Sequence, residues 1–136
     1  MSIHESGHAV LAVVQGLGIK YVRLKPKPEV SLNNRLDRIT NRYPSGEIFR
    51  FLLGGFLAER RFYPKLCDCR NSAHDFKAAF LMLPEEEEEQ WLRFRTEADL
   101  LVARYQLAIR TVADELLRRG RLNALQIAKI IRKSSR

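Results

Sequence analysis

Residues 4–14 read HESGHAVLAVV and carry the strongest signal in the sequence. His4 and His8 are four positions apart, so on a helix their imidazoles lie about one turn apart on the same face. With Glu5 beside the first of them, they form the H-E-x-x-H pattern found in zinc hydrolases. Residues 9–14 are apolar almost all round. The stretch therefore predicts a helix inside the domain, with a metal site on one face.

The polar residues of this pattern have different expected roles. His4 and His8 bind Zn²⁺, while Glu5 is the general base. Zinc lowers the pKa of a bound water from ~15.7 towards ~7, and Glu5 takes its proton as the resulting hydroxide attacks a carbonyl. An alternative needs no metal: Ser2 and Glu5 form a capping box, and the histidines are polar residues on the flank of the helix. The apolar run favours the metal interpretation, because a solvated capping-box helix would be more polar.

The 136 residues suffice for one domain, 1–136, with its own hydrophobic core. The pattern predicts a mainly α fold, an α+β domain with a small minor β-sheet. Short strands are expected at residues 19–25, which alternate, and at residues 29–32. Helical segments are expected after Ser45, from Ser72 to Leu83, from Gln90 to Arg119 and from Leu122 to Ile131, with the later ones forming a C-terminal helical hairpin or bundle.

Gly54 and Gly55 lie inside the helix that follows Ser45. Each glycine costs a helix up to ~1 kcal/mol relative to alanine. The pair therefore implies a packing reason, such as the close approach of another helix at the metal site.

A catalytic zinc site normally has three protein ligands and one open position. No third histidine follows His8 at the spacing that metzincins use. The third ligand must therefore come from a distant part of the sequence. The residues alone leave these candidates open: Glu47, Glu59, Cys67, Asp68, Cys69, His74 and Asp75.

Three stretches together resemble the peptidase domain of the FtsH-type ATP-dependent zinc proteases: HESGHAV at residues 4–10, LGGFLAE at residues 53–59 and SAHD at residues 72–75. The resemblance spans nearly the whole chain. It implies a helical zinc-peptidase domain in which Asp75 is the third zinc ligand and Glu59 supports the ligands from outside. The chain departs from the family's Gly-Gly-Arg-x-Ala-Glu element, having Phe56 where the family has arginine.

The sequence contains no G-x-x-x-x-G-K-[ST] phosphate loop, so the expected peptidase is ATP-independent. Its expected substrates are peptides or unfolded protein segments, added as a strand at a sheet edge near Lys20 to Lys25. By analogy with the rings of the family, self-association into a homo-oligomer is expected. The family's domain has residues before the first helix, and the sequence leaves open whether some precede Met1 here.

The formal charge of +8 comes from scattered basic residues without an accompanying aromatic motif, so a nucleic-acid partner is not expected. No apolar run approaches the ~20 residues that cross a bilayer. Cys67 and Cys69 are one residue apart, which favours reduced thiols over a disulfide. We therefore expect a soluble cytoplasmic protein.

Three hypotheses of function follow from these patterns. The leading one is an ATP-independent zinc endopeptidase. The second is a peptidase-like domain that has lost turnover and acts as a binding or scaffolding module, against which the intact Glu5 argues. The third is a basic protein associated with nucleic acid, which predicts an affinity that falls steeply with salt.

Overall fold

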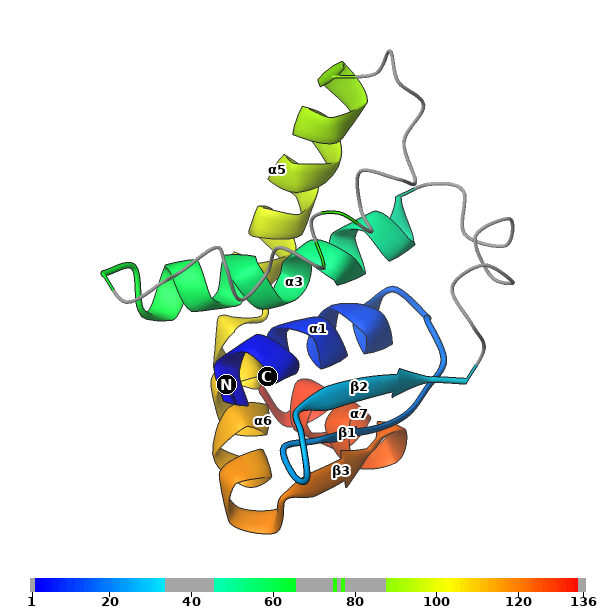
Figure 1. Ribbon diagram of the computed structural model, residues 1–136, viewed down its shortest axis with the longest axis vertical. Helices are drawn as coiled ribbons and strands as arrows, with labels where there is room; N and C mark the ends of the chain where they lie inside the picture. Colours follow the sequence, from blue (N-terminus) through cyan, green and yellow to red (C-terminus); the bar gives the residue numbers. More distant parts are fainter. Residues whose placement is uncertain (1, 34–45, 66–74, 76, 78–87, 135–136) are drawn as a thin grey trace.

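The computed structural model describes residues 2–33, 46–65, 75, 77 and 88–134. The fold is mainly helical with a small antiparallel sheet, as the sequence predicts (Figure 1). Its elements are α1 (Ser2–Val14), β1 (Ile19–Arg23), β2 (Glu29–Leu32), α3 (Glu47–Phe62), α5 (Glu88–Arg104), α6 (Gln106–Arg119), β3 (Arg121–Asn123) and α7 (Ala124–Ser134). Within the described ranges, none of the helices has both the length and the apolar character needed to span a bilayer.

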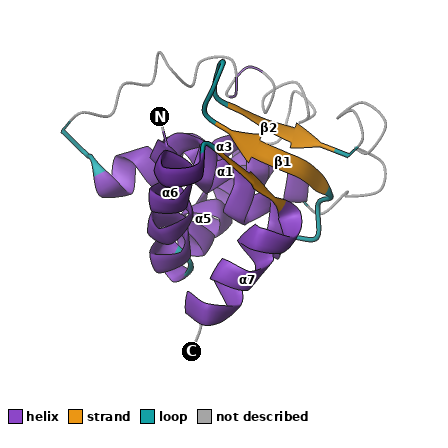
Figure 2. Cartoon of the chain, turned by 90° about the horizontal axis from the view of Figure 1, so that it is seen from below, coloured by secondary structure: helices purple, strands orange, loops and turns teal. Residues whose placement is uncertain are grey.

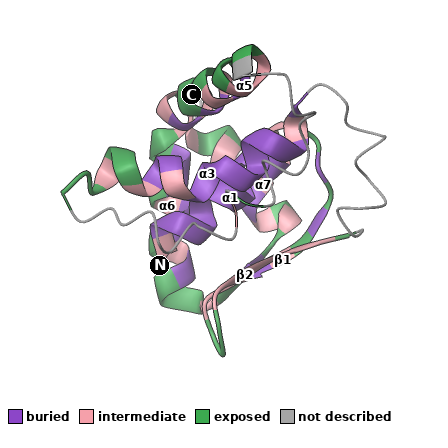
Figure 3. Ribbon diagram, turned by 45° about the horizontal axis from the view of Figure 1, so that its top comes forward, coloured by how far each residue is buried: buried purple, intermediate pink, exposed green. Residues whose placement is uncertain are grey.

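Helix α1 lies at the centre of the molecule, between α3 on one side and α6 with the sheet on the other (Figures 1 and 3). Every residue from Ile3 to Ala12 is buried, as the apolar run after His8 predicts. The buried Ser6 hydroxyl donates to the carbonyl oxygen of Ser2 at 2.6 Å, so it is satisfied within the helix. A helix enclosed in this way holds its side chains in fixed positions.

The sheet lies on one side of the helices, with strand order β2-β1-β3 (Figure 2). Both predicted strands are confirmed. Strand β1 is central, however, since Val22 pairs with Val30 of β2 and with Leu122 of β3. Strand β1 itself is therefore not the sheet edge expected near Lys20 to Lys25, because both of its sides are already hydrogen-bonded.

Strand β3 begins where the sequence predicts the last helix. Leu122 is buried in the sheet instead, and α7 starts only at Ala124. The boundary is fixed by a reciprocal cap: Asn123 Oδ1 accepts from the Gln126 N–H at 2.9 Å, and Gln126 Oε1 accepts from the Asn123 N–H at 2.8 Å.

The helical stretch predicted from Gln90 to Arg119 is two helices that meet at Tyr105. Tyr105 leaves the helical conformation at φ −104° and ψ 20°. Its N–H still donates to Leu101 O and its carbonyl still accepts from Ile109 N–H, both at 2.9 Å, so the bend sacrifices little hydrogen bonding. The bend lets α5 pack on α3 while α6 packs on α1.

Helices α1 and α3 approach each other closely at two glycines. A Cβ on Gly7 would lie 2.4 Å from the carbonyl oxygen of Gly54, and one on Gly54 would lie 2.9 Å from the carbonyl oxygen of Gly7. Backbone atoms cannot give way as a flexible side chain can. The predicted packing reason for the glycine pair is therefore confirmed.

A buried arginine ties three helices together. Arg50 of α3 is only 8% exposed. It donates from Nε to Gln15 Oε1 at 2.5 Å and from Nη1 to Glu97 Oε2 of α5 at 3.1 Å. Gln15, just after α1, donates in turn to the carbonyl oxygen of Glu47 at 3.1 Å. This network fixes the C-terminal end of α1 and the N-terminal end of α3 against the middle of α5, away from the histidines.

Candidate metal centre

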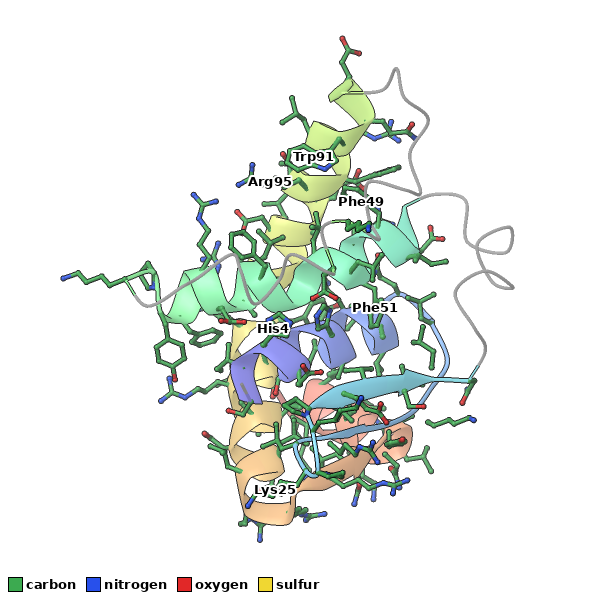
Figure 4. The ribbon with its side chains drawn as sticks, viewed as in Figure 1. His4, Lys25, Phe49, Phe51, Trp91 and Arg95 are labelled. Atoms are coloured by element: carbon green, nitrogen blue, oxygen red, sulfur yellow. The ribbon has the colours of Figure 1, made fainter. Side chains whose placement is uncertain are left out.

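Three side-chain atoms from two distant parts of the chain converge between α1 and α3. His4 Nε2 and His8 Nε2 are 3.0 Å apart. Asp75 Oδ2 lies 3.2 Å from the first and 3.1 Å from the second. In Figure 4, His4 of α1 lies at the surface that α1 shares with α3. Within the described residues, this is the group of histidine, cysteine and acidic side chains that could hold a metal ion.

The other ring nitrogen of each histidine has a hydrogen-bond acceptor. Nδ1 of His8 donates to the carbonyl oxygen of Phe51 at 2.7 Å, and Nδ1 of His4 donates to the Glu59 carboxylate. A carbonyl oxygen can only accept, so the proton of neutral His8 is on Nδ1. The same holds for His4 opposite a carboxylate. Each Nε2 therefore carries a lone pair that faces Asp75.

This donor set fits a zinc ion. Atoms bound to zinc at ~2.0–2.2 Å with tetrahedral angles lie ~3.3–3.6 Å apart, and the three distances here, 3.0, 3.1 and 3.2 Å, are within a few tenths of an ångström of that range. Two imidazoles and one carboxylate are ordinary zinc ligands. Two lone pairs and an anion at this separation repel one another unless a cation, either a proton or a metal ion, lies among them.

The histidine charge is coupled to the surrounding carboxylates. Burial lowers the pKa of His4, but hydrogen bonding to Asp75 and the negative charges of Glu59 and Glu5 outweigh it, so the pKa is raised above 6.5. Burial raises the pKa of Asp75, but its hydrogen bonds to His4 and His8 outweigh that effect and hold the pKa well below its usual range. Without a metal, His4 therefore keeps its proton to a higher pH than a free imidazole does.

Glu5 is only 8% exposed, and the charges of His4, His8 and Asp75 act on its carboxylate. Burial raises its pKa, an effect that the two histidines partly offset. A raised pKa makes this carboxylate a stronger proton acceptor than an ordinary glutamate, as a general base requires.

The backbone of α3 closes one side of the ligand cluster. A Cβ on Gly55 would lie 2.5 Å from His8 Nε2 and 2.7 Å from His4 Nε2. The missing side chain leaves room directly against the two ligand nitrogens. Gly54 and Gly55 thus have separate tasks, the first in helix packing and the second at the site.

The structure brings some of the predicted site residues together and places others elsewhere. His4, His8 and Asp75 come together, with Glu59 and Glu5 beside them. The alternative of two histidines on an exposed helix flank is wrong, because each is 6% exposed. Glu47 instead pairs with Arg50 at 3.5 Å. The candidates Cys67, Asp68, Cys69 and His74, and most of the helix predicted from Ser72 to Leu83, lie outside the described residues.

One contributor to the site escapes sequence reasoning. The carbonyl oxygen of Phe51 fixes the ring of His8, but any residue type carries such an oxygen. The only signal is its position: Phe51 lies four residues before Gly55, one turn earlier on α3.

No protein-family model and no curated protein sequence matches this chain. The resemblance to the FtsH-type peptidases stays a prediction.

Proposed function

We propose that this protein is an ATP-independent zinc metallopeptidase that cleaves peptides or unfolded protein segments internally, in the cytoplasm. The observation that supports it best is the convergence of His4 Nε2, His8 Nε2 and Asp75 Oδ2 at 3.0–3.2 Å with both Nδ1 atoms held by acceptors. Three protein ligands with one position left for water are the usual arrangement of a catalytic zinc.

Each residue has a chemical task in this proposal. His4, His8 and Asp75 would hold the ion, and Glu59 and the Phe51 carbonyl orient the two imidazoles. Bound zinc would supply a Lewis acid that activates water near neutral pH. Glu5 takes a proton from the attacking water and returns it to the leaving amine, a role that its buried position and raised pKa favour.

The substrate would bind in an extended form. Strand β2 lies alongside α1, and within the described residues it pairs with β1 alone (Figure 1). A peptide added to its outer edge would gain backbone hydrogen bonds with little sequence preference. This edge replaces the edge of β1 as the proposed docking strand.

The test is cleavage of a fluorescent, unfolded protein by zinc-loaded enzyme, with and without a chelator. We expect Glu5→Gln to bind zinc with wild-type stoichiometry while its cleavage rate falls at least about 10²-fold, the order that a general base contributes. Undiminished cleavage by this variant would remove the mechanism.

Two further variants separate the ligand candidates. Asp75→Asn should lose zinc, whereas His74→Ala, which changes the neighbouring residue, should keep it. Zinc binding without cleavage of any unfolded substrate would instead favour the binding or scaffolding module. Binding to DNA or RNA that weakens steeply with salt would favour the nucleic-acid hypothesis, which the scattered charge does not.

A further inference from the structure

A second feature with binding character lies on the other side of α3, between its C-terminal half and α5. The pocket there has a volume of about 500 Å³, within the ~300–1,000 Å³ range of ligand sites. Its lining comes from both helices: Leu57, Arg60, Arg61, Leu92, Arg95 and Thr96, with Asp99. None of these residues takes part in the metal centre.

The pocket is strongly basic. Its lining holds three arginines, and among the described lining residues Asp99 is the one acidic side chain. Arg61 Nη2 lies 3.9 Å from Asp99 Oδ1, at the outer limit of an ion pair, so Arg61 is only weakly neutralised. A group that binds in this pocket would therefore have to carry a negative charge.

One of the arginines is held in place by an aromatic ring. The Arg95 guanidinium lies 5.4 Å from the centre of the Trp91 ring, and Figure 4 shows the two side by side on α5, above the C-terminal half of α3. Stacking on a ring orients a guanidinium without using its hydrogen-bond donors or cancelling its charge. Arg95 is thus prepared to bind a carboxylate with two parallel hydrogen bonds.

We propose that this pocket binds an acidic peptide segment, with glutamate or aspartate side chains on the arginines and an apolar side chain between Leu57 and Leu92. A peptide also offers backbone N–H donors, which match the acceptor oxygens of Asp99 and Thr96. A phosphate backbone offers almost only acceptors, so it would leave the acceptor oxygens of Asp99 and Thr96 without donors. The lining therefore fits a peptide better than a nucleic acid.

The inference goes beyond the proposed function and does not depend on it. Arg60 directly follows Glu59, which holds His4, yet the two residues face different sides of α3. A segment bound in the pocket would leave the metal centre open. Binding here needs neither zinc nor cleavage, so the two proposals can fail separately.

The experiment measures fluorescence anisotropy of a labelled octapeptide containing four glutamates and two leucines, and of a matched peptide with glutamine for glutamate. Both are titrated with Glu5→Gln protein so that the probe is not consumed. We expect the acidic peptide to bind at least about tenfold more tightly than the glutamine peptide. In the Arg60→Gln/Arg95→Gln variant this preference should disappear.

The matched control is Arg93→Gln/Arg110→Gln, which removes the same charge from arginines outside the pocket and should change the affinity less than about twofold. Thermal melts check that each variant is folded. Should the double pocket variant unfold, Arg60→Gln alone, whose side chain is exposed, carries the test. Equal losses in pocket and control variants would overturn the proposal. So would equal binding of the two peptides, or pocket-dependent binding of a single-stranded oligonucleotide in preference to the acidic peptide.

Discussion

Glu59 is the residue that links α3 to His4, the first of the proposed zinc ligands, since it accepts the proton of His4 Nδ1. Glu59→Gln removes the negative charge but keeps an oxygen acceptor in place. We expect zinc affinity to fall about 10–100-fold, the usual effect of losing such a partner. Competition with a chromophoric chelator measures the change. Glu97→Gln, which alters a glutamate in the Arg50 network on α5, should leave the affinity unchanged. Equal losses in both variants would indicate general destabilisation.

Substitution of Gly55 tests whether an ion occupies the space next to the Nε2 atoms of His4 and His8. The Cβ added in Gly55→Ala would lie 2.5 Å from His8 Nε2 and 2.7 Å from His4 Nε2, so the two imidazole rings must shift. We expect zinc affinity to fall at least about 10²-fold, measured by the same competition. Gly16→Ala is the control: its Cβ meets no atom within 4 Å, although its φ of +79° makes the substitution strained. That control should lose about 1 kcal/mol of stability and no zinc affinity.

At the scale of elements, the contact between α1 and α3 depends on the absence of side chains at two positions. Gly7→Ala places a Cβ 2.4 Å from the Gly54 carbonyl oxygen and 2.7 Å from Ala58 Cβ, so the helices must separate. We expect a loss of about 3 kcal/mol in the free energy of unfolding, at the upper end of overpacking costs. Urea denaturation of the metal-free protein measures it. A loss no larger than that of Gly16→Ala would mean that the helices do not approach this closely.

The elements also show which parts of the fold are visible in the sequence. The first helix and the glycine contact were predictable because motif, apolar run and helix-breaking residues point the same way. The bend at Tyr105 was not, because it lies in an unbroken helical stripe and needs neither glycine nor proline. Strand β3 is three residues long, too short to show a period of two, and exists because Leu122 pairs with Val22, 100 residues earlier in the chain. The boundary between β3 and α7 could nonetheless be predicted, because the spacing of Asn123 and Gln126 is that of a capping box.

At the scale of the whole molecule, metal and protons should compete to hold the folded state together. His4 has a raised pKa, so its contribution to stability is complete below its unfolded value of 6.5 and is lost as the pH rises through its folded pKa. Glu5, raised by burial, acts in the same direction. Asp75 has a lowered pKa, so its contribution is present above its unfolded value of 3.8 and is lost as the pH falls below it.

The metal-free protein should therefore be most stable at about pH 4–4.5, between the unfolded pKa values of Asp75 and Glu5, and become less stable towards pH 8. With zinc the decline should vanish, because metal binding requires the deprotonated imidazoles. Melting temperatures from pH 4 to pH 8, with chelator or with excess zinc, measure both curves. In Asp75→Asn, the difference in melting temperature between the chelator and zinc curves should become smaller at every pH. Parallel curves in the unsubstituted protein would show that no metal replaces the proton.

The central position of α1 has a consequence for how the protein is made. This helix leaves the ribosome before everything that surrounds it: α3 follows, and α6, which encloses its other side, is complete only at Arg119. At roughly 5–20 residues per second, translation leaves the two histidines without their full enclosure for about 6–23 s. The proposed metal centre would thus gain its full enclosure only late in synthesis, after its own residues have all been made.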